Sequence, residues 1–209
     1  MIIAIDGTTA SGKGTLAKNV AARYGLARLD TGAIYRAVAL ALLDAGADPT
    51  DARAAEAAAR ALDLSAIDEN RIRSGAVGAA ASVVAAQPAV RAVLLDAQRA
   101  FARQPGGAVL DGRDIATVVC PDAHVKLFVI ADLSVRAARR AAELAARGES
   151  VDLTDLTAQI AARDERDANR PIAPLRQAPD AHLLDTTALP IESAAARAFA
   201  IIDAALGRP

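Results

Sequence analysis

The residues most suited to chemistry begin with a glycine-bounded segment near the N-terminus, Gly7-Thr8-Thr9-Ala10-Ser11-Gly12-Lys13-Gly14-Thr15. The apolar run Ile2–Ile5 precedes this segment, and a helix-prone, alanine-rich stretch up to Tyr24 follows it. A strand, a glycine-rich turn and a helix with lysine at its start form the cradle that binds nucleoside-triphosphate phosphates. Backbone N–H groups and the helix N-terminus attract the anion, and the lysine adds a full positive charge. The segment therefore predicts a triphosphate site.

Two details of this segment refine the prediction. Lysine is rare in the chain: only Lys13, Lys18 and Lys126 occur among 24 basic residues, so a lysine at this position is informative. The usual pattern has Ser or Thr directly after the lysine as a Mg²⁺ ligand, but Gly14 stands there and Thr15 follows. We therefore expect Mg²⁺ as cofactor, held mainly by the phosphates of the bound triphosphate and by water, with no protein metal ligand.

Two further segments follow predicted strands, where parallel sheets bind their ligands. The first is Asp30-Thr31-Gly32-Ala33-Ile34-Tyr35-Arg36, in which a hydroxyl at a helix start and an arginine one turn later suit a second phosphate. The second is Asp111-Gly112-Arg113-Asp114, where two carboxylates flank an arginine at the end of a buried strand. An ordinary capped helix and a plain loop are the alternatives.

A third segment, Arg163-Asp164-Glu165-Arg166-Asp167-Ala168-Asn169-Arg170-Pro171, concentrates charge near the C-terminal third of the chain. On a helix, positions 163, 167 and 170 share one face because they lie four and then three residues apart. With Arg136, Arg139 and Arg140 from the preceding helix, this face can gather several guanidinium groups. A solvated, self-paired surface is the alternative. Because Pro171 ends the helix beside a loop, the segment suits a mobile lid.

The elements that must position these residues alternate between short apolar runs and amphipathic stretches, which predicts an α/β fold with a parallel sheet. We expect a single domain: a core of 1–30, 79–146 and 171–209, an insertion at about 31–78 and a lid at about 147–170. Residues 48–78 fit the alternation poorly. The expected strands are Ile2–Ile5, Ala27–Leu29, Ala108–Leu110, Val125–Ile130 and His182–Leu184; the expected helices are Lys13–Tyr24, Gly32–Ala45, Ala89–Arg103, Leu133–Arg147, Leu153–Ala168 and Ile191–Leu206.

Composition narrows the class of protein. The 209 residues are 53% hydrophobic but only 2% aromatic, and the formal net charge of −1 lacks the basic excess of a nucleic-acid binder. The N-terminal apolar run is too short for a signal peptide, and no uncharged stretch is long and apolar enough to span a membrane. A single cysteine, Cys120, excludes an internal disulfide. We expect a cytoplasmic protein, a monomer, with no nucleic-acid or membrane partner.

Taken together, these segments resemble the signature motifs of the bacterial cytidylate kinases, which belong to the P-loop nucleoside monophosphate kinases. The likeness covers the segments that start at Gly7, Asp30, Asp111 and Arg163, the last continuing through Ile172-Ala173-Pro174-Leu175, and the closing Leu184-Asp185-Thr186-Thr187. It runs from Met1 to about Ala205, in family order. The resemblance implies a P-loop NTPase-type three-layer fold with a five-stranded parallel sheet, a nucleotide-binding insertion and a short lid.

The resemblance also implies transfer of the ATP γ-phosphate to CMP or dCMP and assigns residues to each substrate. Residues 7–15 would hold ATP. The acceptor phosphate would contact Thr31, Arg36, Arg113 and Arg170; the cytosine would contact Ser82, Arg91 and Asp114; the ribose would contact Arg163 and Asp167; and Tyr35 would also line the CMP site. Lys13, Arg139, Arg163 and Arg170 are the expected catalytic residues.

Departures from the family pattern leave parts of this assignment open. The 48–78 stretch is shorter than the usual insertion, Thr31 replaces a commoner serine, and Ala116 replaces a glycine. The preference for ribose or deoxyribose is therefore not predicted. Rival classes are a small-metabolite kinase, a kinase of UMP or other monophosphates, and a non-catalytic nucleotide-binding regulator. A GTP-driven switch is disfavoured, because neither Asp-x-x-Gly nor Asn/Thr-Lys-x-Asp occurs in the chain.

Overall fold

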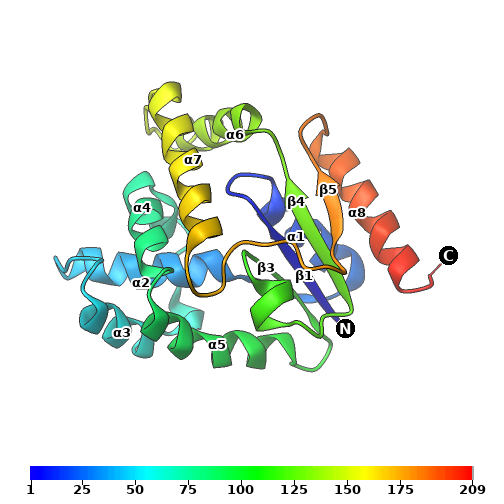
Figure 1. The fold of residues 1–209 in the computed structure, drawn as a ribbon, viewed down its shortest axis with the longest axis horizontal. Helices are drawn as coiled ribbons and strands as arrows, with labels where there is room; N and C mark the ends of the chain where they lie inside the picture. The colour runs from blue at the N-terminus through cyan, green and yellow to red at the C-terminus, as the bar shows by residue number, and fades with distance from the viewer. Residues whose placement is uncertain (209) are drawn as a thin grey trace. The chain divides into compact units, whose positions relative to one another are not determined.

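The computed structural model describes residues 1–208. Its strands are β1 (Ile2–Gly7), β2 (Ala27–Asp30), β3 (Ala108–Gly112), β4 (Val125–Ile130) and β5 (His182–Asp185). They form one five-stranded sheet in the order β2-β3-β1-β4-β5, in which β1 pairs in parallel with β3 and β4, and β4 with β5 (Figure 1). The predicted α/β fold with a five-stranded parallel sheet is confirmed.

The central strands run further than their apolar pattern predicts. The sequence places the end of β1 at Ile5 and the end of β3 at Leu110, but the pairing continues through Ile5 opposite Asp111 and Asp6 opposite Gly112. Asp6 and Asp111 are buried, with 1% and 5% of their surface exposed. Backbone pairing extends both strands past the apolar residues, and it thereby carries two carboxylates into the end of the sheet.

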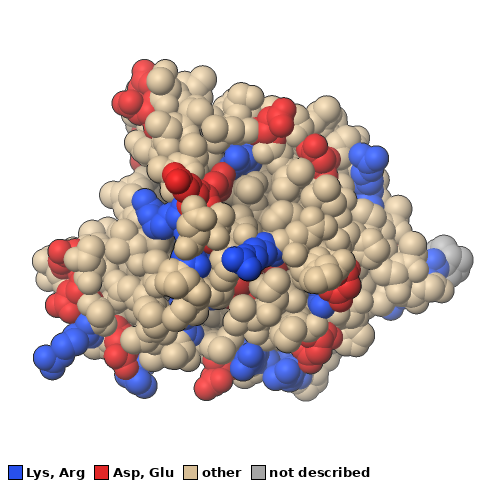
Figure 2. Space-filling model, viewed as in Figure 1, with Lys and Arg blue, Asp and Glu red and all other residues tan. Residues whose placement is uncertain are grey.

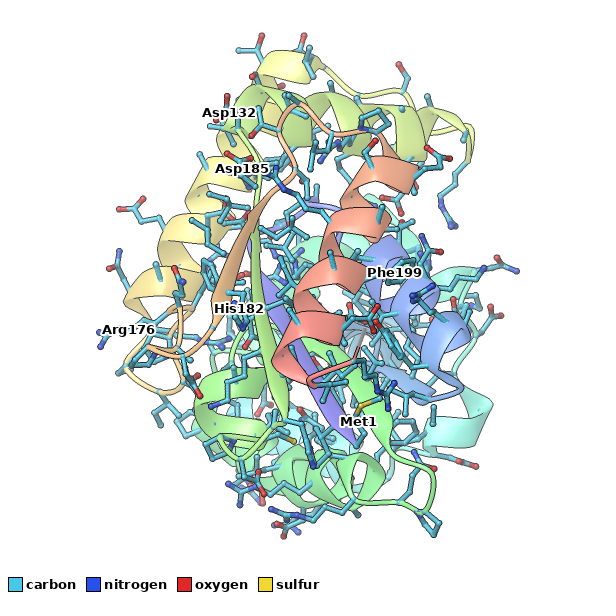
Figure 3. All side chains as sticks on the ribbon, turned by 90° about the vertical axis from the view of Figure 1, so that its right-hand side faces the viewer. Met1, Asp132, Arg176, His182, Asp185 and Phe199 are labelled. Carbon is cyan, nitrogen blue, oxygen red and sulfur yellow. The ribbon has the colours of Figure 1, made fainter. Side chains whose placement is uncertain are left out.

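Helices α1 (Lys13–Tyr24) and α8 (Ile191–Ala205) cover one face of the sheet. Apolar side chains of both helices pack with those of the strands, and Phe199 of α8 meets Tyr24 of α1 edge to face at 6.2 Å between ring centres (Figure 3). Small residues let these helices lie close to the sheet. The buried set is Ile3, Ile5, Leu16, Ala17, Val20, Ala21, Val109, Val125, Leu127, Val129, Leu184, Ala195, Ala198 and Ile202.

Helices α6 (Leu133–Ala145) and α7 (Leu153–Asn169) follow β4 and pack against each other. Their contact buries Leu144 of α6 with Leu156 and Ile160 of α7. Asp152 begins α7 by accepting hydrogen bonds from the backbone N–H groups of Thr154 and Asp155, the usual role of an N-cap carboxylate. The helix ends two residues before Pro171, as predicted.

The chain divides into two compact units, one made of residues 1–29 with the chain from Phe101 onward, the other of Asp30–Ala100. In the second unit, α2 (Thr31–Asp44) packs against α3 (Ala52–Arg60), the short helix η2 (Arg71–Arg73) and α4 (Gly75–Val84). The remaining elements there are η1 (Leu64–Ala66) and α5 (Pro88–Ala102).

Helix α4 is absent from the predicted helices. Its run of Gly, Ala and Val residues has no polar face, so the periodicity that marks an amphipathic helix is missing. Ser74 caps the helix by accepting a hydrogen bond from the Val77 N–H. The helix is buried by packing against α2, a contact that the sequence pattern does not predict.

No single helix among residues 1–208 is long and apolar enough to cross a membrane; α4 and α5 reach the required length and composition only as a pair bent by 98°. Acidic and basic side chains are interspersed on the face drawn in Figure 2.

Candidate active site

The phosphate loop (residues 7–15) joins β1 to α1, and its backbone requires glycine at two positions. Gly7 has φ of 146°, and a Cβ atom there would lie 1.9 Å from the carbonyl oxygen of Val129 on β4. Gly12 precedes α1 with a left-handed φ of 89°. Ala10, between them, is also left-handed at 58°, a conformation that residues with a side chain rarely adopt. The strand, tight turn and helix that the sequence predicts are all present.

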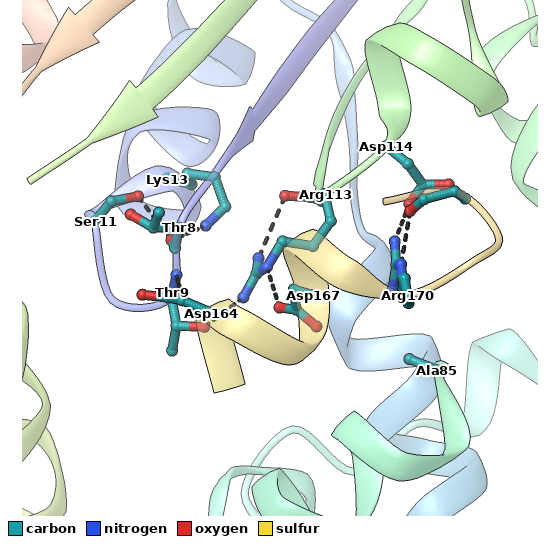
Figure 4. A network of polar contacts seen from close by, with 12 residues as sticks. Thr8, Thr9, Ser11, Lys13, Ala85, Arg113, Asp114, Asp164, Asp167 and Arg170 are labelled. Carbon is teal, nitrogen blue, oxygen red and sulfur yellow. Dashed lines mark hydrogen bonds and ion pairs between the residues drawn. The ribbon is translucent and has the colours of Figure 1, made fainter. Parts of the chain in front are cut away.

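Polar side chains of the loop converge on Thr8 (Figure 4). Lys13 Nζ donates to the Thr8 carbonyl oxygen at 2.6 Å, and Ser11 Oγ donates to the same oxygen at 3.0 Å. Both Ser11 and Lys13 are buried. The Thr8 hydroxyl is buried too, and within residues 1–208 it has no hydrogen-bond partner. A buried hydroxyl without a partner is costly, so this loop retains a donor for a bound anion.

Thr9, next in the loop, is held by three side chains from elsewhere in the same unit. Asp164 of α7 accepts from the Thr9 backbone N–H at 3.2 Å, Arg136 of α6 donates to the Thr9 carbonyl at 3.1 Å, and Arg113 donates to the Thr9 hydroxyl at 2.8 Å. Arg136 and Asp164 also form a hydrogen-bonded ion pair with each other. Helices α6 and α7 are therefore tied directly to the phosphate loop.

Arg113 joins the strand β3 end to α7. Its Nε donates to Asp167 at 2.9 Å while its Nη2 reaches Thr9 (Figure 4). Burial by itself raises the pKa of the Asp167 carboxyl, but the charges of Arg113 and Arg163 outweigh burial and hold that pKa below its ordinary value. Asp167 is thus an ionised acceptor. The structure brings together three predicted site residues here: Arg113, Arg163 and Asp167.

Asp114 and Arg170 form a second buried pair, with Nη2 of Arg170 at 3.3 Å from the Asp114 carboxylate. Arg170 lies just beyond α7, at its C-cap, with extended backbone, so it does not share the helix face of residues 163 and 167 that the spacing predicts. Its Nε donates to the Ala173 carbonyl at 2.6 Å. The guanidinium is therefore aimed by the turn after the helix.

The remaining residues predicted to bind CMP lie in the second unit. Thr31 is buried at the first position of α2, and Arg36 one turn later pairs with Asp30 at 2.8 Å. The Arg36 Nε is buried and has no hydrogen-bond partner within residues 1–208. Arg91 lies over the ring of Tyr35 at 5.6 Å, and Ser82 is buried in α4.

The three arginines of α6 do not converge as the sequence predicts. Arg136 reaches Thr9, whereas Arg140 pairs with Glu143 of its own helix. Arg139 donates to the hydroxyl and the carbonyl oxygen of Thr186, at 3.1 and 2.7 Å. Positions 136, 139 and 140 share one face of the helix, so it is their different partners, Thr9, Thr186 and Glu143, that separate the guanidinium groups.

Sequence reasoning missed the residues that brace the loop from outside it. Thr186, after β5, donates to the Ser11 carbonyl at 2.9 Å. Arg28 of β2 donates through Nε and Nη2 to Asp111 at 3.2 and 3.0 Å, next to Gly14. Asp6 accepts hydrogen bonds from the backbone N–H groups of Ile115 and Ala116, which lie far from it in sequence. Asp6 is marked in the sequence as a polar residue after an apolar run, and Thr186 belongs to the closing segment that resembles the family; Arg28, inside an expected strand, has no such signal.

The pKa of the Asp6 carboxyl is raised by its surroundings. Burial raises the pKa of its carboxyl to about 6, although hydrogen bonds from the Ala116 and Ile115 N–H groups act in the opposite direction. The nearby Asp114 carboxylate raises the pKa further, and Lys13 lowers it. The carboxylate persists in a buried place because backbone donors compensate for lost water.

Within residues 1–208, no three His, Cys, Asp or Glu side chains cluster so that they could hold a metal ion. At position 14 a Cβ atom would lie 3.4 Å from Arg28 Nη2 and 3.9 Å from Asp111 Oδ2. The carboxylate of Asp111 therefore lies beside the position where a loop hydroxyl usually meets Mg²⁺.

The fold and this loop define a P-loop protein of the nucleotide-binding α/β class. The family model for cytidylate kinase matches residues 3–204. The chain is 60% identical over 205 residues to the cytidylate kinase of Rhodopseudomonas palustris (strain TIE-1), covering 98% of this chain and 96% of that protein. The same figures hold for the cytidylate kinase of Bradyrhizobium sp. (strain ORS 278). The chain belongs to the cytidylate kinase family, and the predicted family is confirmed.

Among solved structures, the chain is similar to TT1252 from Thermus thermophilus, with a TM-score of 0.50 and 22% identity over 99% of this chain and 97% of that one. This likeness concerns the fold alone.

Proposed function

We propose that the protein transfers the γ-phosphate of ATP to CMP or dCMP, producing ADP and CDP or dCDP in pyrimidine nucleotide metabolism. Membership of the cytidylate kinase family supports the reaction. The observation that carries it is local: the phosphate loop with buried Lys13 contacts Arg113, whose guanidinium is paired to Asp167. Thr9, a residue of the loop that would bind the donor phosphates, thus contacts Arg113, which would bind the acceptor.

ATP would bind through residues 7–15. Backbone N–H groups at the start of α1 and the ammonium of Lys13 would neutralise its phosphates. The unpartnered Thr8 hydroxyl supports an anion in this loop. The Thr9 N–H now bonds Asp164, so a phosphate oxygen that takes this donor would displace the carboxylate. Movement of α7 during turnover would follow from that exchange, in keeping with the predicted lid.

CMP would bind through the residues that the family resemblance assigns to it. In the proposal, the phosphate is bound by Thr31, Arg36, Arg113 and Arg170, the sugar by Arg163 and Asp167, and the base by Ser82, Arg91 and Asp114, while Tyr35 also lines the CMP site. Support within the structure is the ionised Asp167, which can accept from a sugar hydroxyl, and the buried Arg36 Nε without a partner.

Base choice would rest on hydrogen-bond polarity. Cytosine presents an amino donor beside ring acceptors, so Asp114 can accept from the amino group and Arg91 can donate to the ring. Uracil reverses the two positions that these groups would meet. Each protein group left without a partner in a dry site costs roughly 1–3 kcal/mol, which would make CMP the better substrate by well over tenfold.

Phosphoryl transfer requires alignment, exclusion of water and neutralisation of charge more than covalent chemistry. Lys13 would serve the donor phosphates, and Arg113 and Arg170 the acceptor phosphate. Arg163 and Arg170 would also neutralise the charge that develops on the transferring group. Arg139 is held by Thr186 in this structure, so a direct role for it requires that pair to open; bracing the loop through Thr186 is the simpler role.

Mg²⁺, when bound with ATP, would screen charge on the phosphates. Thr15 is exposed and Gly14 has no oxygen, so the phosphates and water would supply its ligands, with Asp111 able to accept from such a water. Arg28 would hold that carboxylate in place. A cytoplasmic monomer remains the prediction for its location and assembly.

The decisive experiment is a coupled ADP-release assay with ATP and a panel of CMP, dCMP, UMP, AMP and shikimate. The proposal requires CMP and dCMP to exceed the others in kcat/KM by well over tenfold. Equal use of UMP or AMP would contradict the cytosine assignment while leaving the phosphate loop intact, and turnover with shikimate would favour the small-metabolite alternative. ATP binding without any turnover would favour a regulator.

A further inference from the structure

Asp6 acts on a segment far from it in sequence. It lies at the end of β1, directly before the phosphate loop, with 1% of its surface exposed. Its Oδ1 accepts from the Ile115 N–H at 2.9 Å and its Oδ2 from the Ala116 N–H at 2.7 Å. These N–H groups begin η3 (Ile115–Val119), a short π-helical turn that directly follows Asp114.

Asp114 occupies the N-cap position of η3, where an aspartate ordinarily bonds the first N–H groups of its own helix. Asp30, Asp51 and Asp152 do so at the starts of α2, α3 and α7. Asp114 makes no such bond, although it is buried. Asp132 likewise makes none, but it is exposed to water.

Because Asp6 already holds the N–H groups of Ile115 and Ala116, the Asp114 carboxylate does not bond the Ala116 N–H, which is one of the usual donors to an N-cap side chain. It meets Arg170 instead, 56 residues away. The two carboxylates therefore have different partners: Asp6 caps the turn, and Asp114 pairs with Arg170 outside it.

We propose that Asp6 is a positioning residue for base choice: by capping η3 in place of Asp114, it keeps the Asp114 carboxylate available to the cytosine amino group. This inference rests on the proposed function, in which Asp114 contacts the base. In a variant without the Asp6 cap, Asp114 turns back to bond the N–H groups of its own helix, and it then competes poorly for CMP.

The test is the ratio of kcat/KM for CMP to kcat/KM for UMP in Asp6→Asn, measured alone and in an Asp114→Ala background. An amide offers one acceptor oxygen where the carboxylate offers two, so one N–H of η3 loses its partner. We expect the ratio to fall about tenfold in the single variant, mainly through a higher KM for CMP. In the Asp114→Ala background, Asp6→Asn should change the ratio less than twofold, because residues that act as a unit are not additive.

Controls separate positioning from general loss of stability. Ile202→Ala removes a fully buried side chain of α8 from the core of the same unit, and the CMP-to-UMP ratio should stay as in the unaltered protein. If Asp6→Asn is too unstable to purify, Asp6→Ser, which retains one acceptor oxygen in a smaller side chain, takes its place in the same measurements.

Two results would overturn the inference alone: an unchanged ratio in the Asp6 variants, or an equal fall in the ratio with and without Asp114. Both leave the proposed function standing if the unaltered protein prefers CMP and Asp114→Ala loses that preference. Equal use of CMP and UMP by the unaltered protein would overturn the proposed function and this inference together.

Discussion

The phosphate loop and the arginine–carboxylate cluster (Arg113, Asp114, Arg163, Asp167 and Arg170) are built in different ways. The loop is made by nine consecutive residues and by backbone conformations that glycine permits at Gly7 and Gly12. The cluster is made by charged side chains 54 and 56 residues apart, which pair as Arg113 with Asp167 and Arg170 with Asp114. A local backbone site tolerates change poorly at its glycines and lysine, whereas a cluster of pairs distributes its function over several side chains.

The largest effect should come from the loop. Lys13→Met preserves bulk but removes the only ammonium within the loop, so turnover should fall by several orders of magnitude while the fold persists. The measurement is kcat in the ADP-release assay, with circular dichroism to check folding. Turnover within tenfold of the unaltered protein would remove Lys13 from its role.

The cluster should show the next largest effect at Arg170. An arginine that stabilises the charge of a transferring phosphoryl group contributes roughly 10³–10⁵ in rate, so Arg170→Ala should lower kcat by about 10³-fold. Arg147→Ala, on an exposed residue just after α6, is the matched control and should change kcat less than twofold. Similar small effects at both positions would mean that the charged run is a solvated surface.

Asp6 interacts electrostatically with Lys13 of the loop and with Asp114 of the cluster. Its ionisation should make the free energy of unfolding depend on pH. The pKa is about 6 in the folded protein and near the ordinary 3.8 in the unfolded chain. Between these values the folded state holds a proton that the unfolded state has released, so the free energy of unfolding falls as pH rises from about 4 to 6. Two pKa units correspond to about 3 kcal/mol.

Urea unfolding of the unaltered protein and of Asp6→Asn at several pH values measures this term. The stability of the unaltered protein relative to the variant should decline by about 3 kcal/mol between pH 4 and pH 7. Other carboxyls, including Asp167 with its lowered pKa, are common to both proteins and cancel in the difference. A difference that is independent of pH would show that Asp6 is not perturbed.

The smallest expected effect concerns base choice. Asp114→Ala should reduce the preference for CMP over UMP about tenfold, mainly by weakening CMP, since UMP does not make the contact. The measurement is kcat/KM for both nucleotides. Equal loss with CMP and UMP would mean instead that Asp114 serves to orient Arg170, with which it pairs.

Much of the fold could be predicted because its signals are local. Apolar runs located all five strands, and Pro171 marked the end of α7. The prediction failed where the signal is not local: α4 has no polar face, and β1 and β3 continue through Asp6 and Asp111 because a neighbouring strand pairs with them. The predicted bounds of core, insertion and lid, and the roles of the site residues, remain predictions.

The sequence by itself determined the phosphate loop, because glycine conformations and the lysine at a helix start depend on adjacent residues. It also determined which charged residues exist near strand ends. Only the tertiary structure decided how those charges are used: Arg139 holds Thr186, Arg136 and Asp164 hold Thr9, and Asp6 caps a turn more than a hundred residues away. Each choice depends on which donor and acceptor the folded chain brings within 3 Å or so, and spacing along the sequence does not contain that information.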